Sequence, residues 1–257
     1  MHATIVKIQR FPIKGLSPEP LDEIELQPGD GIPLDRMYGF AQHWAKFDPA
    51  NPAPLPKENF VVLLKQEALA KLNTSFDPSS GEFSCSSPDG AQRFNLATEE
   101  GRRAAENWLS DFLAFANDEQ PSFVHAAPHR FTDVSVVSPQ MMNAVSLLNL
   151  ESVRDLGQRL DAEIDPARFR ANIEFTGLPA WWELDNVGSI LRAGDVTFRL
   201  LKRTQRCAAT EVNPVSAERD LKLPYLLRKE MGHMVMGVYA EVLTGGVLKT
   251  GEVLQRQ

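Results

Sequence analysis

The sequence predicts a mainly β protein (α+β) with an antiparallel β-barrel and a few peripheral helices. Short segments rich in β-branched and aromatic residues recur along the chain, and turn-forming residues separate them. Helical patterns are few and do not alternate regularly with the strands, as they would around a parallel sheet. Together these two observations favour a β-barrel over a parallel α/β fold.

Residues 1–120 are expected to form an N-terminal β subdomain. Strands are predicted in "ATIVKIQRFPI" and "LDEIELQ", with a turn in "QPGDGIPLDR". Four prolines in "FDPANPAPLPKEN" make residues 48–57 an exposed loop or flap. "FVVLLKQEALAKL" suits a buried strand that runs into a helical turn, and "GEFSCSSPDGAQRFNL" suits a hairpin that turns at "PDG". A helix capped by Thr98 closes the subdomain.

Residues 121–257 are expected to form a second domain. A helical zone is predicted from Ser138 to Leu160, where "SP" is a typical helix start. The alternating patterns of "ANIEFTG" and "GDVTFRLL" then predict strands. A short helix, "PYLLRKEMG", precedes two or three strands in "MVMGVYAEVLTGGVLKTGEVLQ".

Composition limits the function classes. The chain has 257 residues and a formal net charge of −7, which argues against nucleic-acid or anionic-membrane partners because these need a basic surface. The two cysteines lie far apart and form no CxxC pair, so a reducing compartment is expected. Without a signal-peptide pattern or an apolar run of roughly 18 to 20 residues, we predict a cytoplasmic protein with no membrane partner.

Common catalytic motifs are absent from the sequence: it contains no GxxxxGK[ST], GxGxxG, HExxH or GxSxG. "HAAPH", at residues 125–129, has the i, i+4 histidine spacing of a zinc helix. Pro128 argues against a helix there, so an exposed loop is expected.

Cys207 lies in "LKRTQRCAATEVNP", directly after Lys202, Arg203 and Arg206. Cations near a thiol favour its thiolate, the reactive and metal-binding form. If the strand reached Cys207, only Arg203 would share its face. The alternative is that Cys207 is a small buried hydrophobic residue beside a solvated edge, and Cys85, in a polar hairpin, suits that structural role better.

Three segments in a fixed order resemble the MOSC domain, which is named for the C-terminal domain of molybdenum cofactor sulfurases. These segments are "RFRANIEFTG", "LLKRTQRCAATEVNP" and "GVYAEVLTGGVLKTGEVL". The N-terminal "IVKIQRFPIKGLSPEPLDEIELQPGDGIPLDRMYGF" resembles the MOSC N-terminal β-barrel domain.

The resemblance implies a protein that binds molybdenum cofactor (Mo-molybdopterin). In relatives that reduce N-hydroxylated compounds, including the mitochondrial amidoxime reducing component, the cysteine that matches Cys207 is a molybdenum ligand. A thiolate is a soft ligand suited to such a metal, and the pterin phosphate needs cations. Cys207 is therefore expected as metal ligand and catalytic residue. The expected cofactor-binding residues are Lys14, Arg36, Arg168, Arg170, Asn172, Arg203, Arg206 and Thr210.

The chain also departs from the pattern of these reductases. Gly15 replaces a serine that commonly follows the lysine, and Asn213 stands where an aspartate is common. The resemblance still implies an oxidoreductase that acts on a small N-hydroxylated or similar N-oxygenated compound. Two cysteines cannot hold a Cys-ligated [2Fe-2S] domain and no flavin or nicotinamide motif occurs, so electrons are expected from a separate reductase.

Two alternatives stay open at this point. The protein could instead carry molybdenum cofactor, or carry sulfur as a persulfide on Cys207, without turnover. It could also use metal-free thiol chemistry, with Cys207 activated by a histidine such as His233.

Overall fold

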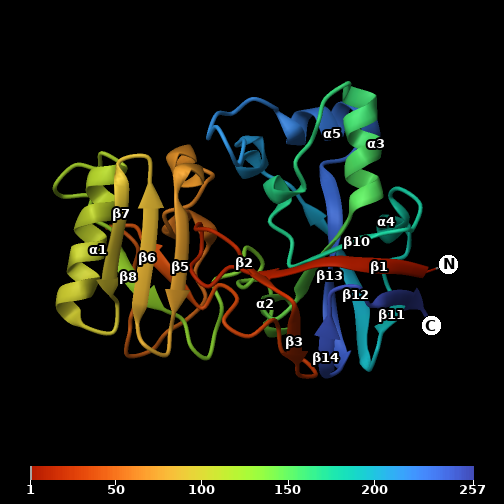
Figure 1. Ribbon diagram of the computed structural model, residues 1–257, viewed down its shortest axis with the longest axis horizontal. Coiled ribbons are helices and arrows are strands. Elements are labelled where there is room, and N and C mark those ends of the chain that lie inside the picture. The colour runs from red at the N-terminus through yellow and green to blue at the C-terminus, as the bar shows by residue number, and fades with distance from the viewer. Residues whose placement is uncertain (1) are drawn as a thin grey trace.

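A closed barrel of seven strands forms one lobe of the structure, a computed structural model that describes residues 2–257 (Figure 1). The barrel strands are β1 (His2–Arg10), β9 (Val145–Asn149), β10 (Ile173–Thr176), β11 (Ile190–Ala193), β12 (Val196–Gln205), β13 (Val235–Thr244) and β15 (Val253–Arg256). Their hydrogen-bonded order is β10-β9-β13-β12-β11-β15-β1, and β1 pairs with β10 to close the ring. Among the described residues these pairs are antiparallel, apart from the parallel pair of β9 and β10. The expected mainly β, barrel-type fold is confirmed.

Alternation along the strands fills the barrel interior. Val196, Phe198 and Leu200 on β12 are at most 1% exposed, and polar residues lie between them. Phe175 on β10 and Ile5 on β1 are buried in the same cluster. Side chains of successive strand residues point to opposite faces, so one apolar face per strand is enough to build this core.

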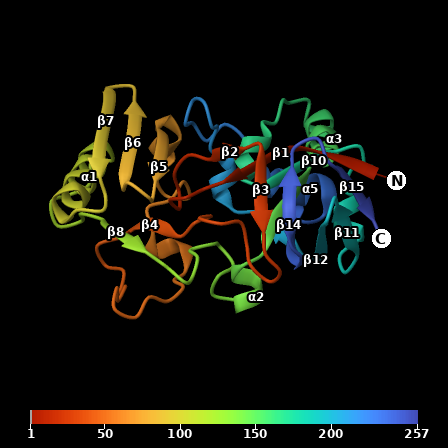
Figure 2. The ribbon, with the colours of Figure 1, turned by 60° about the horizontal axis from the view of Figure 1, so that its bottom comes forward.

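The second lobe is a small sheet covered by a helix (Figure 2). Strands β5 (Asn73–Asp77), β6 (Glu82–Ser87) and β7 (Gly90–Asn95) form an antiparallel sheet, and β6 and β7 are the predicted hairpin. Helix α1 (Glu99–Phe112) packs on it, and the hydroxyl of Thr98 caps the helix by accepting a hydrogen bond from the Gly101 amide, as expected. Strands β4 (Tyr38–Ala41) and β8 (Ser122–His125) pair beside it.

The expected division near residue 120 stays a prediction, and strand pairing crosses it. β1, from the N-terminal half, completes the barrel, with β2 (Glu19–Leu21) at its edge. β3 (Glu23–Leu26) pairs with β14 (Gly246–Lys249) from the other end of the chain. Strands β1, β2 and β3 are therefore built into the lobe that the C-terminal half forms, whereas Ile13 and Leu16 pack in the core of the small lobe.

Several local predictions are wrong. The zone from Ser138 to Leu160 is α2 (Pro139–Met142), the buried strand β9, and α3 (Leu150–Leu160) in place of one helical zone. A fully buried strand has no polar face, so its apolar run cannot be told from a helix by periodicity. "FVVLL" forms an isolated bridge at Phe60 and a turn before the 3-10 helix η2 (Glu67–Lys71).

The remaining elements are short. They are the 3-10 helices η1 (Lys57–Asn59), η3 (Pro166–Phe169) and η4 (Ala208–Glu211), and the helices α4 (Trp182–Asp185) and α5 (Leu223–Met231). Of the expected loop at residues 48–57, residues 48–56 contain neither helix nor strand, and Lys57 begins η1. Between residues 2 and 257, no helix combines the length and the apolar character needed to cross a membrane.

Candidate functional site

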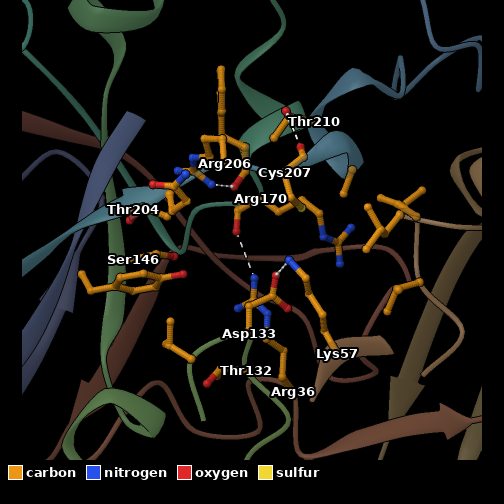
Figure 3. Close-up of a pocket in the computed structure, with 18 of the residues that line it drawn as sticks. Arg36, Lys57, Thr132, Asp133, Ser146, Arg170, Thr204, Arg206, Cys207 and Thr210 are labelled. Atoms are coloured by element: carbon orange, nitrogen blue, oxygen red, sulfur yellow. Dashed lines mark hydrogen bonds and ion pairs between the residues drawn. The ribbon is translucent and has the colours of Figure 1, made fainter. Parts of the chain in front are cut away.

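A cavity of about 280 Å³ lies between the two lobes, and residues from both line it (Figure 3). This volume is at the lower end of the roughly 300 to 1,000 Å³ that is typical of small-molecule sites. Every residue that the sequence analysis proposed for the site lines this cavity. These residues are Lys14, Arg36, Arg168, Arg170, Asn172, Arg203, Arg206, Cys207 and Thr210.

Cys207 is half-buried and sits where β12 has ended and η4 begins. Its carbonyl oxygen accepts hydrogen bonds from the amide of Thr210 at 3.0 Å and from the hydroxyl of Thr210 at 2.9 Å (Figure 3). Thr210 therefore holds the turn that presents the thiol. The chain leaves the strand before Cys207, so alternation along β12 does not decide which cations surround the thiol.

Arg36 and Arg170 form a pair on the cavity wall. Both have left-handed backbones, with φ of 53° and 49°, which non-glycine residues adopt rarely and mostly at special sites. Both guanidinium carbons lie over the ring of Phe11, at 4.3 and 4.2 Å from its centroid. Arg36 pairs with Asp35 at 2.6 Å, whereas no carboxylate within residues 2–257 pairs with Arg170. Burial, together with the nearby charge of Arg36, lowers the pKa of Arg170 to about 9.

Arg168, Arg170 and Asn172 would share one strand face only if the strand predicted in "ANIEFTG" began early, and it does not. Arg168 belongs to η3, Arg170 follows it with a left-handed backbone, and β10 begins only at Ile173. The 3-10 turn starts at Pro166, whose fixed φ suits a helical first position, so the chain does not extend early.

A lysine-carboxylate cluster of Lys14, Lys57 and Asp133 lies beside Arg36, and the sequence predicted only Lys14 of these three. Asp133 accepts a 2.6 Å hydrogen bond from the ammonium of Lys14, and the Lys57 ammonium lies 3.7 Å from its other oxygen (Figure 3). Burial alone would raise the pKa of Asp133, but Lys14 and Lys57 hold it well below its usual value. Burial lowers the pKa of Lys57, but Asp133 and Cys207 outweigh this and raise it. Lys57 is therefore a cation close to the thiol.

Arg206 and Asn172 use their side-chain polar groups in hydrogen bonds to the backbone and to a neighbouring side chain. Arg206 donates to the carbonyls of Met236 and Phe169, and burial lowers its pKa to about 10. The Asn172 side chain joins Ser146 to the carbonyl of Gln9. These hydrogen bonds fix the cavity floor, so the charge of Arg206 reaches the cavity but most of its donors are used.

Arg168 and Arg203 differ in where their guanidinium groups bind. Arg168 pairs with Asp220 at 2.7 Å, and its buried Nε has no hydrogen-bond partner in the described chain. Arg203 donates to the Leu184 carbonyl at 2.8 Å and lies near Asp185 in α4. Neither Leu184 nor Asp185 lines the cavity, so the Arg203 guanidinium is turned away from it.

Charge and hydrogen bonding together indicate what the cavity can bind. Among the described residues, eight lysine and arginine side chains and one carboxylate line it. Lys14 and Lys57 share that carboxylate, and Arg170 and Arg206 have none. The buried Thr204 hydroxyl also lacks a partner among residues 2–257. An anionic group would meet unneutralised charge here, and Cys207 offers a soft ligand beside it. These features fit a phosphate-bearing, sulfur-held molybdenum cofactor.

Histidines do not contribute to this cavity in the part of the chain that the structure describes. His233, the candidate base for metal-free chemistry, packs edge-on against Trp181 with ring centroids 6.0 Å apart. His125, in the expected loop pair, ends β8 and stacks on Tyr38. Residues 2–257 contain no group of three or more His, Cys, Asp or Glu side chains placed to hold a metal ion.

Among the cavity residues that the sequence did not predict are Lys57, Asp133, Thr204 and Tyr239. Thr204 and Tyr239 lie on adjacent strands, β12 and β13, and a correct register would have found them. No local pattern distinguishes Lys57 or Asp133, because Lys57 begins a 3-10 helix of only three residues and Asp133 lies in a turn.

Among curated proteins, none matches the chain. The structure of YiiM from Geobacillus stearothermophilus aligns at 22% identity and a TM-score of 0.35, over 44% of this chain and 53% of that one. YiiM from Escherichia coli aligns at 18% identity and a TM-score of 0.34, also over 44% and 53%. The chain thus spans about half the length of these two relatives. YuaD from Bacillus subtilis aligns at 13% identity and a TM-score of 0.45, over 99% of this chain and 94% of that one.

The family comparison covers the half of the chain that carries Cys207. Residues 124–255 match the family model of the MOSC domain. The N-terminal resemblance lies outside these residues and stays a prediction. MOSC domains are associated with molybdenum cofactor binding. Since the match covers more than half of the chain, this protein belongs to the MOSC domain family.

Proposed function

We propose that the protein binds molybdenum cofactor in this cavity and reduces N-hydroxylated or similar N-oxygenated small molecules. The observation that carries the proposal is a half-buried thiol in a cavity whose cations outnumber its carboxylates. Neither feature alone would be specific, because lone cysteines and basic surfaces are common. Together they match a ligand that is both anionic and thiophilic.

The residues divide the binding task by chemistry. Arg36 and Arg170 supply planar donors for phosphate oxygens, and Lys14 and Lys57 add point charges. Cys207 supplies the thiolate ligand, and Thr210 holds its turn. When bound, the molybdenum cofactor supplies the two-electron redox chemistry that protein side chains lack.

Protons must also reach the reduced group. Reduction of an N-hydroxylated amine to the parent amine consumes two electrons and two protons and releases water. The Tyr239 hydroxyl belongs to a residue that lines the cavity, and burial raises its pKa, so this phenol keeps its proton at neutral pH. Tyr239 is the group in the cavity best suited to hold a proton for the departing hydroxyl.

The electrons would come from a separate reductase. The chain has two cysteines, 122 residues apart in sequence by their numbers, and Cys85 is buried in the small lobe. Two thiols so placed cannot hold an iron–sulfur cluster that would pass electrons within the chain. We also propose a cytoplasmic location, in keeping with free thiols.

Cofactor content tests the first half of the proposal. Protein from a host that makes molybdenum cofactor would be analysed for molybdenum by plasma mass spectrometry and for pterin by fluorescence after oxidation. Wild type should hold both at near one per chain, and Cys207→Ala should lose metal or change its spectrum. Cys85→Ala is the matched control and should keep both. Absence of molybdenum and pterin from wild type would refute the proposal.

Turnover tests the second half. Loaded protein would be given an aromatic amidoxime and reduced methyl viologen, and the amidine product would be quantified. Product formation that Cys207→Ala abolishes supports the reductase. Stoichiometric cofactor without product would favour the carrier function, in which Cys207 holds cofactor or sulfur without reducing a substrate.

A further inference from the structure

One arginine outside the cavity joins two segments that line it. Arg219 follows η4 by eight residues in sequence number and is bridged to Val212. Its Nη2 donates to the carbonyls of Leu63 at 3.0 Å and Leu64 at 2.9 Å. Its Nη1 donates to the carbonyl of Ala208 at 2.8 Å. The same guanidinium therefore binds a segment of the small lobe and the residue directly after Cys207.

The small-lobe segment is the apolar wall of the cavity. We define this wall as Val62, Leu63 and Leu64, which line the cavity. Leu63 and Leu64 are only partly buried, and the wall belongs to a turn without regular strand pairing. A turn of this kind opens more readily than the strands around it, because few hydrogen bonds hold it.

Two carboxylates surround the Arg219 guanidinium. An Oε2 atom of Glu67 lies 3.4 Å from Nη2, and one of Glu211 lies 3.8 Å from Nη1. Glu67 follows the Leu63–Leu64 segment and Glu211 follows the Cys207 turn. The Arg219 side chain is 29% exposed, and its hydrogen bonds are open to solvent. A planar fork with five donors can serve two segments at once, whereas a lysine ammonium acts as a point charge.

A second close contact is made at the start of the wall. A Cβ atom at Gly15 would be 2.5 Å from the carbonyl oxygen of Val61, directly before the wall, and 3.3 Å from the Cα atom of Val62. Gly15 and Arg219 thus both contact the segment that carries the wall. The serine-to-glycine departure at position 15 has a physical reason here, since the wall occupies the space of a side chain.

We propose that Arg219 is a positioning residue that fixes the apolar wall against the Cys207 turn and so limits the size of the molecules that reach Cys207. This inference rests on the proposed function in one respect, because it takes Cys207 as the centre that a substrate must reach. It concerns access alone and does not depend on whether molybdenum binds.

The test measures access to Cys207 in metal-free, full-length protein. Rates of alkylation at Cys207 would be followed by peptide mass spectrometry with iodoacetamide and with a fluorescein maleimide, and their ratio taken. In Arg219→Gln the bulky-to-small ratio should rise about tenfold, because the wall loses charge-assisted hydrogen bonds and opens more often. Arg219→Lys should restore part of the selectivity. Arg159→Gln, which removes a surface ion pair with Asp155 in α3, is the matched control and should leave the ratio unchanged.

The ratio of the two alkylation rates separates access from general destabilisation. General destabilisation would raise both alkylation rates, and it would also affect the Arg159→Gln control. An unchanged ratio in folded Arg219→Gln would overturn the proposal, as would an equal rise in Arg159→Gln. If Arg219→Gln does not fold, Arg219→Lys is judged by the same two criteria. A changed ratio in a protein that never binds molybdenum would keep this inference and refute the proposed function.

Discussion

The guanidinium of Arg36 donates a 3.0 Å hydrogen bond to the backbone carbonyl of Arg170, 134 residues away in sequence. Both residues have left-handed backbones and both stack on Phe11. Two like charges are held together here by a carbonyl and an aromatic ring rather than by a carboxylate between them. Such an arrangement costs stability unless a ligand uses the charge.

Arg170→Gln should therefore affect binding more than folding. The variant keeps the carbonyl that Arg36 uses, and removal of a partly buried charge with no carboxylate partner offsets the lost contacts with Phe11 and the Leu16 carbonyl. We expect the free energy of unfolding of metal-free protein to change by no more than about 1 kcal/mol. Pterin and molybdenum content should fall about tenfold or more, as for a lost hydrogen bond to a charged group. A large loss of stability in urea with normal cofactor content would contradict this.

Asp133→Asn should destabilise the protein in a pH-dependent way. The folded pKa of Asp133 is held below its ordinary value of 3.8, so its contribution is fully present above that pH and is lost as pH falls toward the folded pKa. At neutral pH we expect a loss of roughly 1 to 3 kcal/mol, less than for a fully buried pair because the carboxylate is half-exposed. Urea unfolding would be measured at pH 7, 5 and 3. The difference in the free energy of unfolding between Asp133→Asn and wild type should be smaller at pH 3 than at pH 7. Asp89→Asn, in the exposed turn after β6, should show no such trend.

Gly15→Ala should be more costly than Gly29→Ala. Both glycines have positive φ, of 87° and 72°, which costs an alanine roughly 1 to 2 kcal/mol. Only at Gly15 would the new Cβ meet backbone, at 2.5 Å from the Val61 oxygen, whereas nothing lies within 4 Å at Gly29. The extra destabilisation of Gly15→Ala in urea should be about 1 to 3 kcal/mol. If both variants lost the same free energy of unfolding, the backbone near the wall would have shifted to make room for the new Cβ atom.

Native protein should show one reactive thiol per chain. Cys207 is half-buried and lines an open cavity, whereas Cys85 is 2% exposed and burial raises its pKa to about 12. A thiol-disulfide reagent at pH 8 should titrate Cys207 alone, and the second thiol should appear only in denaturant. Cys207→Ala should abolish the native reaction and Cys85→Ala should preserve it. Two thiols reacting in the native state would show that the small lobe opens.

The sequence predicted β12, which has one apolar and one polar face. It did not predict β9, which is apolar on both faces. β12 has buried Val196, Phe198 and Leu200 between polar residues, so its period of two is visible in the sequence. β9 is buried on both faces, and its neighbours in the barrel, β10 and β13, come later in the chain. Only the closed barrel shows that this apolar run is extended.

At the candidate site, too, contacts between segments that are distant in sequence could not be predicted. Resemblance placed Cys207, Lys14 and Arg36 together, and all three line one cavity. Proximity in sequence to Cys207 suggested Arg203 as a cation for that site, yet its guanidinium binds the Leu184 carbonyl. Lys57, which is close to the thiol, is 150 positions away in sequence number and follows a proline-rich segment.

By itself the sequence determined the mainly β fold, the hairpin at residues 82–95, the helix that Thr98 caps and the identity of the thiol. These depend on local periodicity, turn chemistry and residue type, which act over a few residues. Tertiary structure decided which charges meet the thiol, which cations stay unpaired and which apolar turn faces Cys207. Those features depend on the approach of segments from opposite ends of the chain, and the closure of β1 on β10 brings those segments together.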